Sequence, residues 1–165
     1  MRESSFRGKR IDNGEWICSG SLIHFDGDGN NEYYIPAANS KCTCSHDEND
    51  NIIEINEVVF YKVIPETVGQ YTGLTDKNGK KIFEGDIVQA HHNTQKNYTI
   101  GLVIFENGTY KIEVRGKKRQ REFEKYTDAD VRAYAIENNF LNRGFNIEVI
   151  GNIHDNPKLL KGGEG

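Results

Sequence analysis

The residues with the clearest chemical potential are two cysteines and a histidine, Cys42, Cys44 and His46, which lie within five positions of one another. Thiolates and imidazoles are ligands that Zn²⁺ prefers, and Cys18 or His24 could complete a tetrahedral site. Structural zinc sites usually carry cysteine pairs separated by about two to four residues. Here the pair is Cys-x-Cys, and no second pair exists. We therefore expect an exposed loop with free thiols, no metal and no cofactor.

Three carboxylates, Asp76, Glu84 and Asp86, crowd one segment and could form an acid–base pair or a Mg²⁺ site. Asp76 opens an Asp-Lys-Asn-Gly tetrad, in which its side chain can accept hydrogen bonds from backbone N–H groups two residues on. The run from Glu84 to Asp86 has the form of a turn before a strand. The adjacent His91 and His92 would face opposite sides of a strand. We expect turn chemistry and no catalytic residues.

A basic stretch at residues 115–121 could bind phosphate groups. Its five positive charges come from Arg115, Lys117, Lys118, Arg119 and Arg121. Glu122 and Glu124 follow at once, and no aromatic residue for stacking on bases lies within the stretch. The net charge of −4 argues against affinity for nucleic acid over the whole surface. Nucleic-acid binding by this stretch is therefore the alternative hypothesis.

Aromatic residues fall on or beside the expected strands of the central region. Tyr71, Phe83, Tyr98 and Tyr110 could line a groove for an extended peptide, because small β-barrels can display such grooves. Core packing explains the same residues equally well. A one-residue slip in register would exchange the two faces of a strand, so the choice depends on the register.

The elements that would position these residues are short strands separated by turns. We expect strands over residues 15–25, 32–36, 52–64, 86–91, 98–105, 109–114 and 145–153, with a hairpin turn at Asn107-Gly108. One short helix is expected over 127–143, since Val131, Tyr134, Ala135 and Leu141 can share a helix face. No helix separates successive strands, which predicts a mainly β barrel or roll rather than a parallel sheet. The strand pattern leaves the type of barrel open.

The composition is that of a small folded domain with an aromatic core. The chain has 165 residues with eight Tyr, eight Phe and one Trp, although its mean hydropathy is only −0.71. Three cysteines cannot all pair within the chain, which suits a reducing compartment. The sequence contains no apolar run long enough to predict a signal peptide or a membrane span. We expect a cytoplasmic location in a host cell and no membrane partner.

Three blocks occur in a specific order along the chain: MRESSFRGKRIDNGEW at the start, residues 63–88 in the centre and residues 148–157 near the end. Together they resemble the YopX-like family of phage and prophage proteins. The resemblance implies an SH3-like β-barrel core, a phage or prophage origin and no established activity. Residues 39–51 and 115–143 lie between the blocks and look like insertions that vary within the family.

These expectations combine into one reading of the chain. We predict a single YopX-like domain over residues 1–165, with an N-terminal β region at 1–66, an SH3-like barrel at 67–160 and a flexible tail at 161–165; an α+β fold is the alternative. The predicted function is a non-enzymatic scaffold or interaction module, a homo-oligomer that binds a phage or host protein. Exposed strand edges and a modest core support the oligomer.

Overall fold

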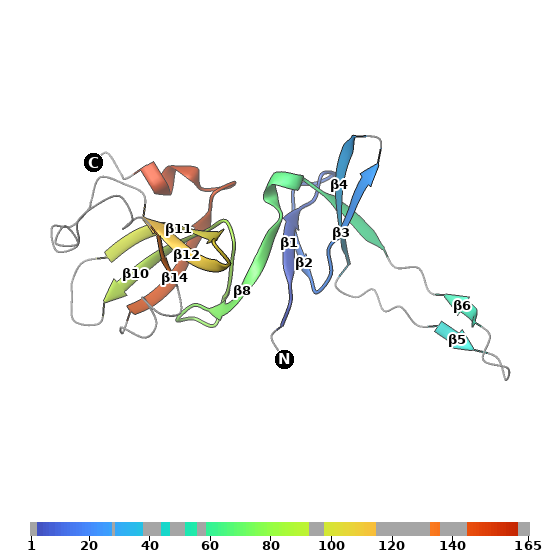
Figure 1. Ribbon diagram of the computed structural model, residues 1–165, viewed down its shortest axis with the longest axis horizontal. Helices are drawn as coiled ribbons and strands as arrows, with labels where there is room; N and C mark the ends of the chain where they lie inside the picture. The colour runs from blue at the N-terminus through green and yellow to red at the C-terminus, as the bar shows by residue number, and fades with distance from the viewer. Residues whose placement is uncertain are drawn as a thin grey trace. The chain divides into compact units, whose positions relative to one another are not determined.

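The computed structural model consists almost entirely of short β-strands and turns (Figure 1). It describes residues 3–27, 29–37, 44–46, 52–55, 59–92, 98–114, 133–135 and 145–161. The chain divides into two compact units, Met1–Gln70 and Tyr71–Gly165. Among the described residues, no helix has the length and apolar character needed to cross a membrane.

The strands of the first unit belong to three small antiparallel sheets. Its elements are β1 (Phe6–Lys9), β2 (Trp16–Ser19), β3 (Ile23–Gly27), β4 (Asn30–Pro36), β5 (Cys44–His46), β6 (Ile52–Ile55), β7 (Phe60–Val63), the 3-10 turn η1 (Pro65–Thr67) and the start of β8 (Gly69–Thr75). β1 pairs with β2 and with the first two residues of β8. A second sheet has the order β3-β4-β7, and β5 pairs with β6.

Close packing and backbone hydrogen bonds join β1 to β7 in this unit. Ile35 and Val63 are fully buried, and a Cβ atom at Gly8 would lie 2.9 Å from the Cβ of Val63. The Thr67 hydroxyl donates to the Ile64 carbonyl at 2.6 Å and accepts the Lys9 N–H at 2.9 Å. The Thr67 side chain therefore links η1 to the backbone of β1.

The second unit is built on a five-stranded antiparallel sheet of order β13-β12-β11-β10-β14. Its elements are β9 (Lys81–Phe83), β10 (Asp86–His92), β11 (Tyr98–Glu106), β12 (Thr109–Val114), β13 (Ala133–Ala135), β14 (Phe145–Asn152) and the 3-10 turn η5 (Pro157–Lys161), together with the rest of β8. Asn107 and Gly108 both have positive φ and connect β11 to β12, so the predicted hairpin turn is confirmed.

Hydrophobic side chains are buried on both faces of this sheet. One cluster includes Val88, Val103 and Ile112. On the other face, Leu160 of η5 packs with Ile87 and Leu102. Neighbouring residues on one strand thus enter opposite clusters, as the two-residue period of a strand requires. The mainly β character and the barrel or roll architecture are confirmed, whereas the SH3-like type of barrel stays a prediction.

Three expected elements differ in the structure. Residues 133–135, inside the expected helix at 127–143, form β13 and pair with Lys111–Glu113 of β12, so the helix prediction is wrong there. Pairing with a distant strand overrides the helical spacing of the apolar residues. The rest of 127–143 lies outside the described residues. The strand expected over 52–64 is represented by two separate strands, β6 and β7. The strand expected over 15–25 is likewise represented by two strands, β2 and β3, which belong to different sheets. The prediction of one domain with lobes 1–66 and 67–160 stays a prediction.

Candidate interaction surface

The residues considered for zinc are only partly described. Cys42 lies outside the described residues, and of Cys44 and His46 only the backbone is described, as part of β5. Cys18 is exposed on β2. Over the part of the chain that the structure describes, no three His, Cys, Asp or Glu side chains are grouped to hold a metal ion. The structure therefore assembles no metal centre from these described residues.

The basic stretch also falls outside the described residues. Nothing in the structure places Arg115, Lys117, Lys118, Arg119 or Arg121. The predicted nucleic-acid interface accordingly stays a prediction that rests on the sequence alone.

The aromatic residues of the predicted groove occupy different environments. Tyr71 and Phe83 face each other across β8 and β9 with ring centroids 5.6 Å apart. Both are only 7% exposed, so they are core residues and line no open groove. Tyr98 is 48% exposed, and Tyr110 is half-buried against the core cluster. Tyr71 and Phe83 point inward because of the register in which β8 and β9 pair, and the sequence alone does not determine that register.

The Asp76 carboxylate organises a turn, as its sequence context predicts. Its Oδ1 accepts the N–H groups of Asn78 at 2.8 Å and Lys80 at 2.9 Å, and its Oδ2 accepts the N–H of Val149 at 3.1 Å. Burial opposes ionisation, but the three backbone donors outweigh it, so the pKa of Asp76 lies below its ordinary value. Asp76 thus joins the β8–β9 turn to β14, and its turn role is confirmed.

The other two carboxylates of this segment also serve backbone structure. Asp86 is 1% exposed, and its Oδ2 accepts the Phe83 N–H at 2.8 Å, which closes the turn between β9 and β10. Burial raises the pKa of Glu84, and a backbone hydrogen bond from Phe105 opposes that rise. Neither arrangement resembles an acid and base aimed at a common substrate position.

An exposed aromatic surface lies on the β3-β4-β7 sheet. Residues paired across antiparallel strands share a face, and the register places Ile23 beside Tyr34, Tyr34 beside Lys62, and Pro36 beside Phe60. Phe25, paired with Glu32, belongs to the same face. We call this surface the aromatic face and define it by Ile23, Phe25, Tyr34, Pro36 and Phe60. Ile35 and Val63 point to the opposite, buried face.

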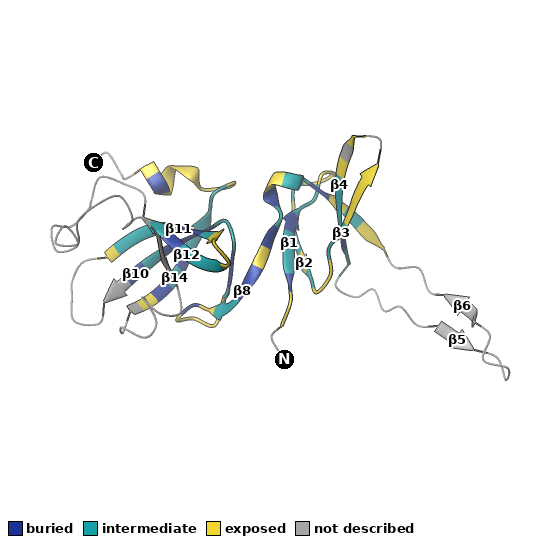
Figure 2. Ribbon diagram, viewed as in Figure 1, coloured by how far each residue is buried: buried dark blue, intermediate teal, exposed yellow. Residues whose placement is uncertain are grey.

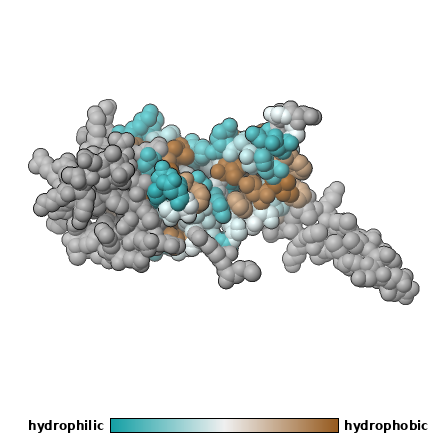
Figure 3. All heavy atoms as spheres, in the orientation of Figure 1, coloured by the Kyte–Doolittle hydropathy of each residue, from teal (hydrophilic) through white to brown (hydrophobic). Residues whose placement is uncertain are grey.

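The aromatic face is open to solvent. Phe25 is 57% exposed and Phe60 is 43% exposed. The rings of Phe25 and Tyr34 meet edge to face with centroids 5.7 Å apart. Figure 2 shows exposed residues along most of β3, and Figure 3 shows hydrophobic residues gathered at the surface of this unit. The sequence alternation could have suggested this face, but only the register of three strands brings its residues together.

A polar group lies at the centre of the aromatic face. The Glu32 carboxylate forms an ion pair with Lys62 and accepts the Tyr34 hydroxyl at 2.7 Å. The hydrogen bond from Lys62, with that from Tyr34, lowers the pKa of Glu32, and the bond to Glu32 raises the pKa of Tyr34. The hydrogen bond to Glu32 thus restricts rotation of the Tyr34 side chain.

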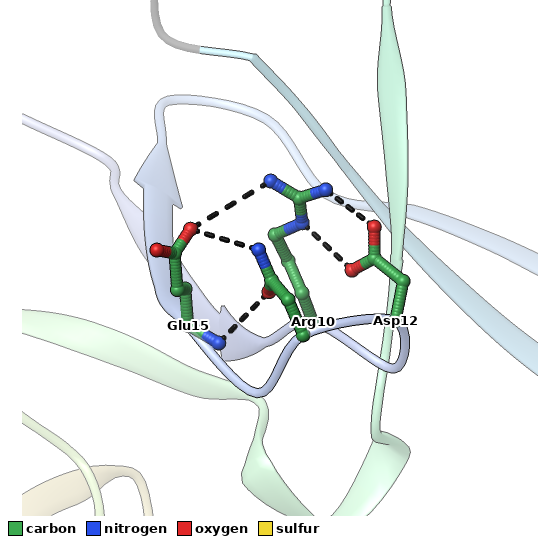
Figure 4. Close-up of polar contacts among 4 residues, drawn as sticks. Arg10, Asp12 and Glu15 are labelled. Carbon is green, nitrogen blue, oxygen red and sulfur yellow. Dashed lines mark hydrogen bonds and ion pairs between the residues drawn. The ribbon is translucent and has the colours of Figure 1, made fainter.

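The opposite face of the same sheet buries Ile35 and Val63, and Arg10 packs on it while pairing with Asp12 and Glu15 (Figure 4). Its guanidinium lies 3.8 Å from the ring centroid of Tyr61. The same group pairs with Asp12, with Nε to Oδ1 at 2.9 Å, and with Glu15 at 3.9 Å. The hydrogen bond from Arg10 lowers the pKa of Asp12. Arg10 therefore holds the β1–β2 loop against the sheet, and the aromatic face is the open side.

Comparisons with known proteins give a family and a fold. The family model described as YopX protein matches residues 5–161. The crystal structure of protein EF1440 from Enterococcus faecalis is similar to this chain with a TM-score of 0.52 and 24% identity, covering 96% of this chain and 98% of that one. That likeness concerns the fold. A search of curated proteins found no match. Because the family model spans nearly the whole chain, the chain belongs to the YopX family.

Proposed function

We propose that this protein is a non-enzymatic interaction module, an accessory protein of phage or prophage origin, and that it binds a partner protein through the aromatic face. The observation that carries the proposal is the exposure of Phe25 and Phe60 on one face of one sheet. Aromatic residues are enriched in protein interfaces, because they bury a large area with little loss of side-chain freedom.

The exposed parts of the two phenylalanines set the scale of the interaction. Phe25 is 57% exposed and Phe60 is 43% exposed, which together equal about one complete side chain. Full burial of one such side chain contributes about 1.5–3 kcal/mol, and the edge of Tyr34 would add to it. The Glu32–Lys62 pair supplies charged groups that would orient a partner with an apolar pocket and a polar rim.

Affinity capture with matched variants tests the proposal. The wild-type protein and the variants Phe25→Ser/Phe60→Ser and Phe105→Ser would be used as bait in lysate of phage-infected host cells, with and without nuclease treatment. Phe105 is 52% exposed in the other unit and serves as the control. We expect proteins that the wild type and Phe105→Ser retain and that the double variant loses, because only the double variant removes apolar area from the aromatic face.

Two outcomes would overturn the proposal. If all three baits retain the same proteins, the aromatic face has no part in binding. If the retained material disappears after nuclease treatment and binding falls steeply with salt, phosphate contacts account for it, and the basic stretch at 115–121 becomes the better explanation. Circular dichroism of each variant verifies that the fold is retained.

A further inference from the structure

β3 is an edge strand with unusual exposure. Among the described strands it lies at the end of the order β3-β4-β7, and its residues from His24 to Gly27 are exposed. An edge strand presents backbone N–H and C=O groups that can pair with another strand. Proteins commonly protect such edges with charged side chains, and β3 carries His24 and Asp26. The positions of His24 and Asp26 on β3 allow this edge to pair with another strand in one specific register.

The hairpin register identifies the backbone groups at the free edge. The Ala37 N–H donates to the Val59 carbonyl at 2.8 Å, so the alternate residues Ile35 and Tyr33 turn their backbone groups toward β7, and Glu32 turns its own toward β3. Hydrogen-bonded and non-hydrogen-bonded pairs alternate along antiparallel strands. Phe25 therefore directs its N–H and C=O toward Glu32 of β4. The N–H and C=O groups of His24 and Asp26 point away from β4, to the open edge.

We propose that β3 pairs in antiparallel fashion with β3 of a second copy of this chain, with the two-fold axis at Phe25. In this register, His24 lies opposite Asp26 of the second copy, and the same pair occurs again on the other side of the axis. These are the residues whose backbone groups point outward, so each pair can exchange two hydrogen bonds. The inference goes beyond the proposed function, because it concerns a different edge and a different partner.

The side chains of His24 and Asp26 distinguish this register from its neighbours. A shift by two residues in one direction places Asp26 opposite Asp26 of the second copy, and the opposite shift places His24 opposite His24. Only the register centred on Phe25 pairs each histidine with an aspartate. The register that sets Asp26 opposite Asp26 brings two carboxylates together, and like charges directly opposite one another destabilise a sheet. Phe25 then meets Phe25 of the second copy in a non-hydrogen-bonded pair, in which side chains approach most closely.

The pairing has a consequence for the aromatic face. Residues opposite one another across a strand pair lie on the same face, so the two copies of Phe25 would be neighbours on one continuous six-stranded sheet. The aromatic faces of the two copies would join at the axis. A self-complementary contact of this kind closes as a dimer with two-fold symmetry rather than as an open fibre.

Complementary charge variants test the register in solution. Sedimentation velocity over a concentration series would compare the wild type with His24→Glu and Asp26→Lys. His24→Glu places two carboxylates opposite each other twice, and Asp26→Lys removes the carboxylate from both pairs, so we expect each variant to dimerise about tenfold more weakly or worse. In an equal mixture of the two variants, the mixed dimer sets the introduced carboxylate opposite the introduced amine in one pair and keeps the His24–Asp26 pair in the other, and it should recover wild-type association. A wild type that remains monomeric at every concentration, or a mixture no stronger than its components, would overturn the proposal.

Cross-linking tests the position of the axis directly. In a background with Cys18, Cys42 and Cys44 changed to Ser, Phe25→Cys places two thiols opposite each other, with Cα atoms about 4.5 Å apart, within the range of a disulfide. We expect Phe25→Cys to form a covalent dimer under mild oxidation and the control His24→Cys to remain largely monomeric. Equal cross-linking of both would refute this register. Neither result depends on whether a partner protein is captured by the aromatic face.

Discussion

Replacement of Asp76 by Asn would test whether the β8–β9 turn is fastened to β14 by one ionised side chain. The Asp76 carboxylate is 7% exposed and accepts N–H groups from Asn78, Lys80 and Val149. The amide of Asp76→Asn has nearly the same shape. It can still accept two of the bonds through its oxygen, but its NH₂ group would face the buried N–H of Val149, donor to donor.

The expected loss follows from the three bonds. Hydrogen bonds to a charged group contribute about 1.5–3 kcal/mol each, and neutral ones about 1 kcal/mol. Asp76→Asn keeps two neutral bonds and leaves the Val149 N–H without an acceptor in a buried position. We therefore expect the free energy of unfolding to fall by about 2–4 kcal/mol, less than a simple sum because the other two bonds are only partly buried.

Urea unfolding followed by circular dichroism would measure this loss. Asp155→Asn is the matched control, since Asp155 is exposed and its carboxylate accepts the Asn152 side-chain amide at 2.9 Å. We expect the control to cost less than about 1 kcal/mol. A loss for Asp76→Asn no larger than that of the control would refute the idea that this carboxylate holds the turn.

The same measurement has a defined pH dependence. The pKa of Asp76 is lower in the folded chain than in the unfolded one. Its contribution is therefore complete above the unfolded value of about 3.9 and is lost as the pH falls through the folded value. The difference in stability between wild type and Asp76→Asn should be constant from about pH 7 to pH 5 and should shrink below about pH 4. A constant difference at all pH values would assign the effect to shape rather than to charge.

Two further predictions concern the second unit. Burial raises the pKa of Glu84, so above that raised pKa the folded state carries an unfavourable buried charge. Glu84→Gln should therefore increase the free energy of unfolding at neutral pH and lose this advantage below about pH 4. Urea unfolding at both pH values would measure the difference. Gly101→Ala should lower the free energy of unfolding by about 1–3 kcal/mol, because its Cβ would meet the Ile112 side chain and lie 2.8 Å from the Glu113 carbonyl oxygen. Thermal unfolding would measure the loss, with Gly27→Ala as the control, since no atom lies within 4 Å of a Cβ at Gly27.

Local chemistry explains which predictions from the sequence succeeded. The turn at Asp76 depends on residues within four positions, and the acceptance of the Asn78 and Lys80 N–H groups follows from the side chain itself. The Asn107-Gly108 hairpin likewise needs only two residues that tolerate positive φ. The hydrogen bond from the Val149 N–H to Asp76 joins residues 73 positions apart, and no local sequence pattern predicts it.

Distant pairing explains which predictions failed or were missed. Residues 133–135 have the spacing of a helix face, yet they pair with β12. Tyr71 and Phe83 were candidates for an exposed groove, yet their strands turn both rings into the core. Phe25 and Phe60 belong to strands separated by more than thirty residues and share a face only through β4. In each case the deciding contact is a strand register, which a one-residue slip would reverse.

The two units differ in how the faces of their sheets are covered. In the second unit, both faces of the main sheet are buried, and η5 places Leu160 over one of them. In the first unit, the described hydrophobic residues that are buried are Ile35 and Val63, both on one face. A sheet is stable when each apolar face packs against another layer. The aromatic face lacks such a layer within the described part of its own unit.

A bound partner would supply that layer, and the first unit should then gain stability. Binding to the folded state alone raises stability by RT ln(1 + [L]/Kd), which is about 2.7 kcal/mol at a hundredfold excess over Kd. Trp16, the one tryptophan of the chain, lies on β2 of the first unit, so its fluorescence reports the unfolding of that unit. A partner of the aromatic face should therefore shift the Trp16 transition to higher urea. A captured protein that leaves this transition unchanged binds elsewhere, because burial of the open face cannot occur without stabilising the sheet that carries it.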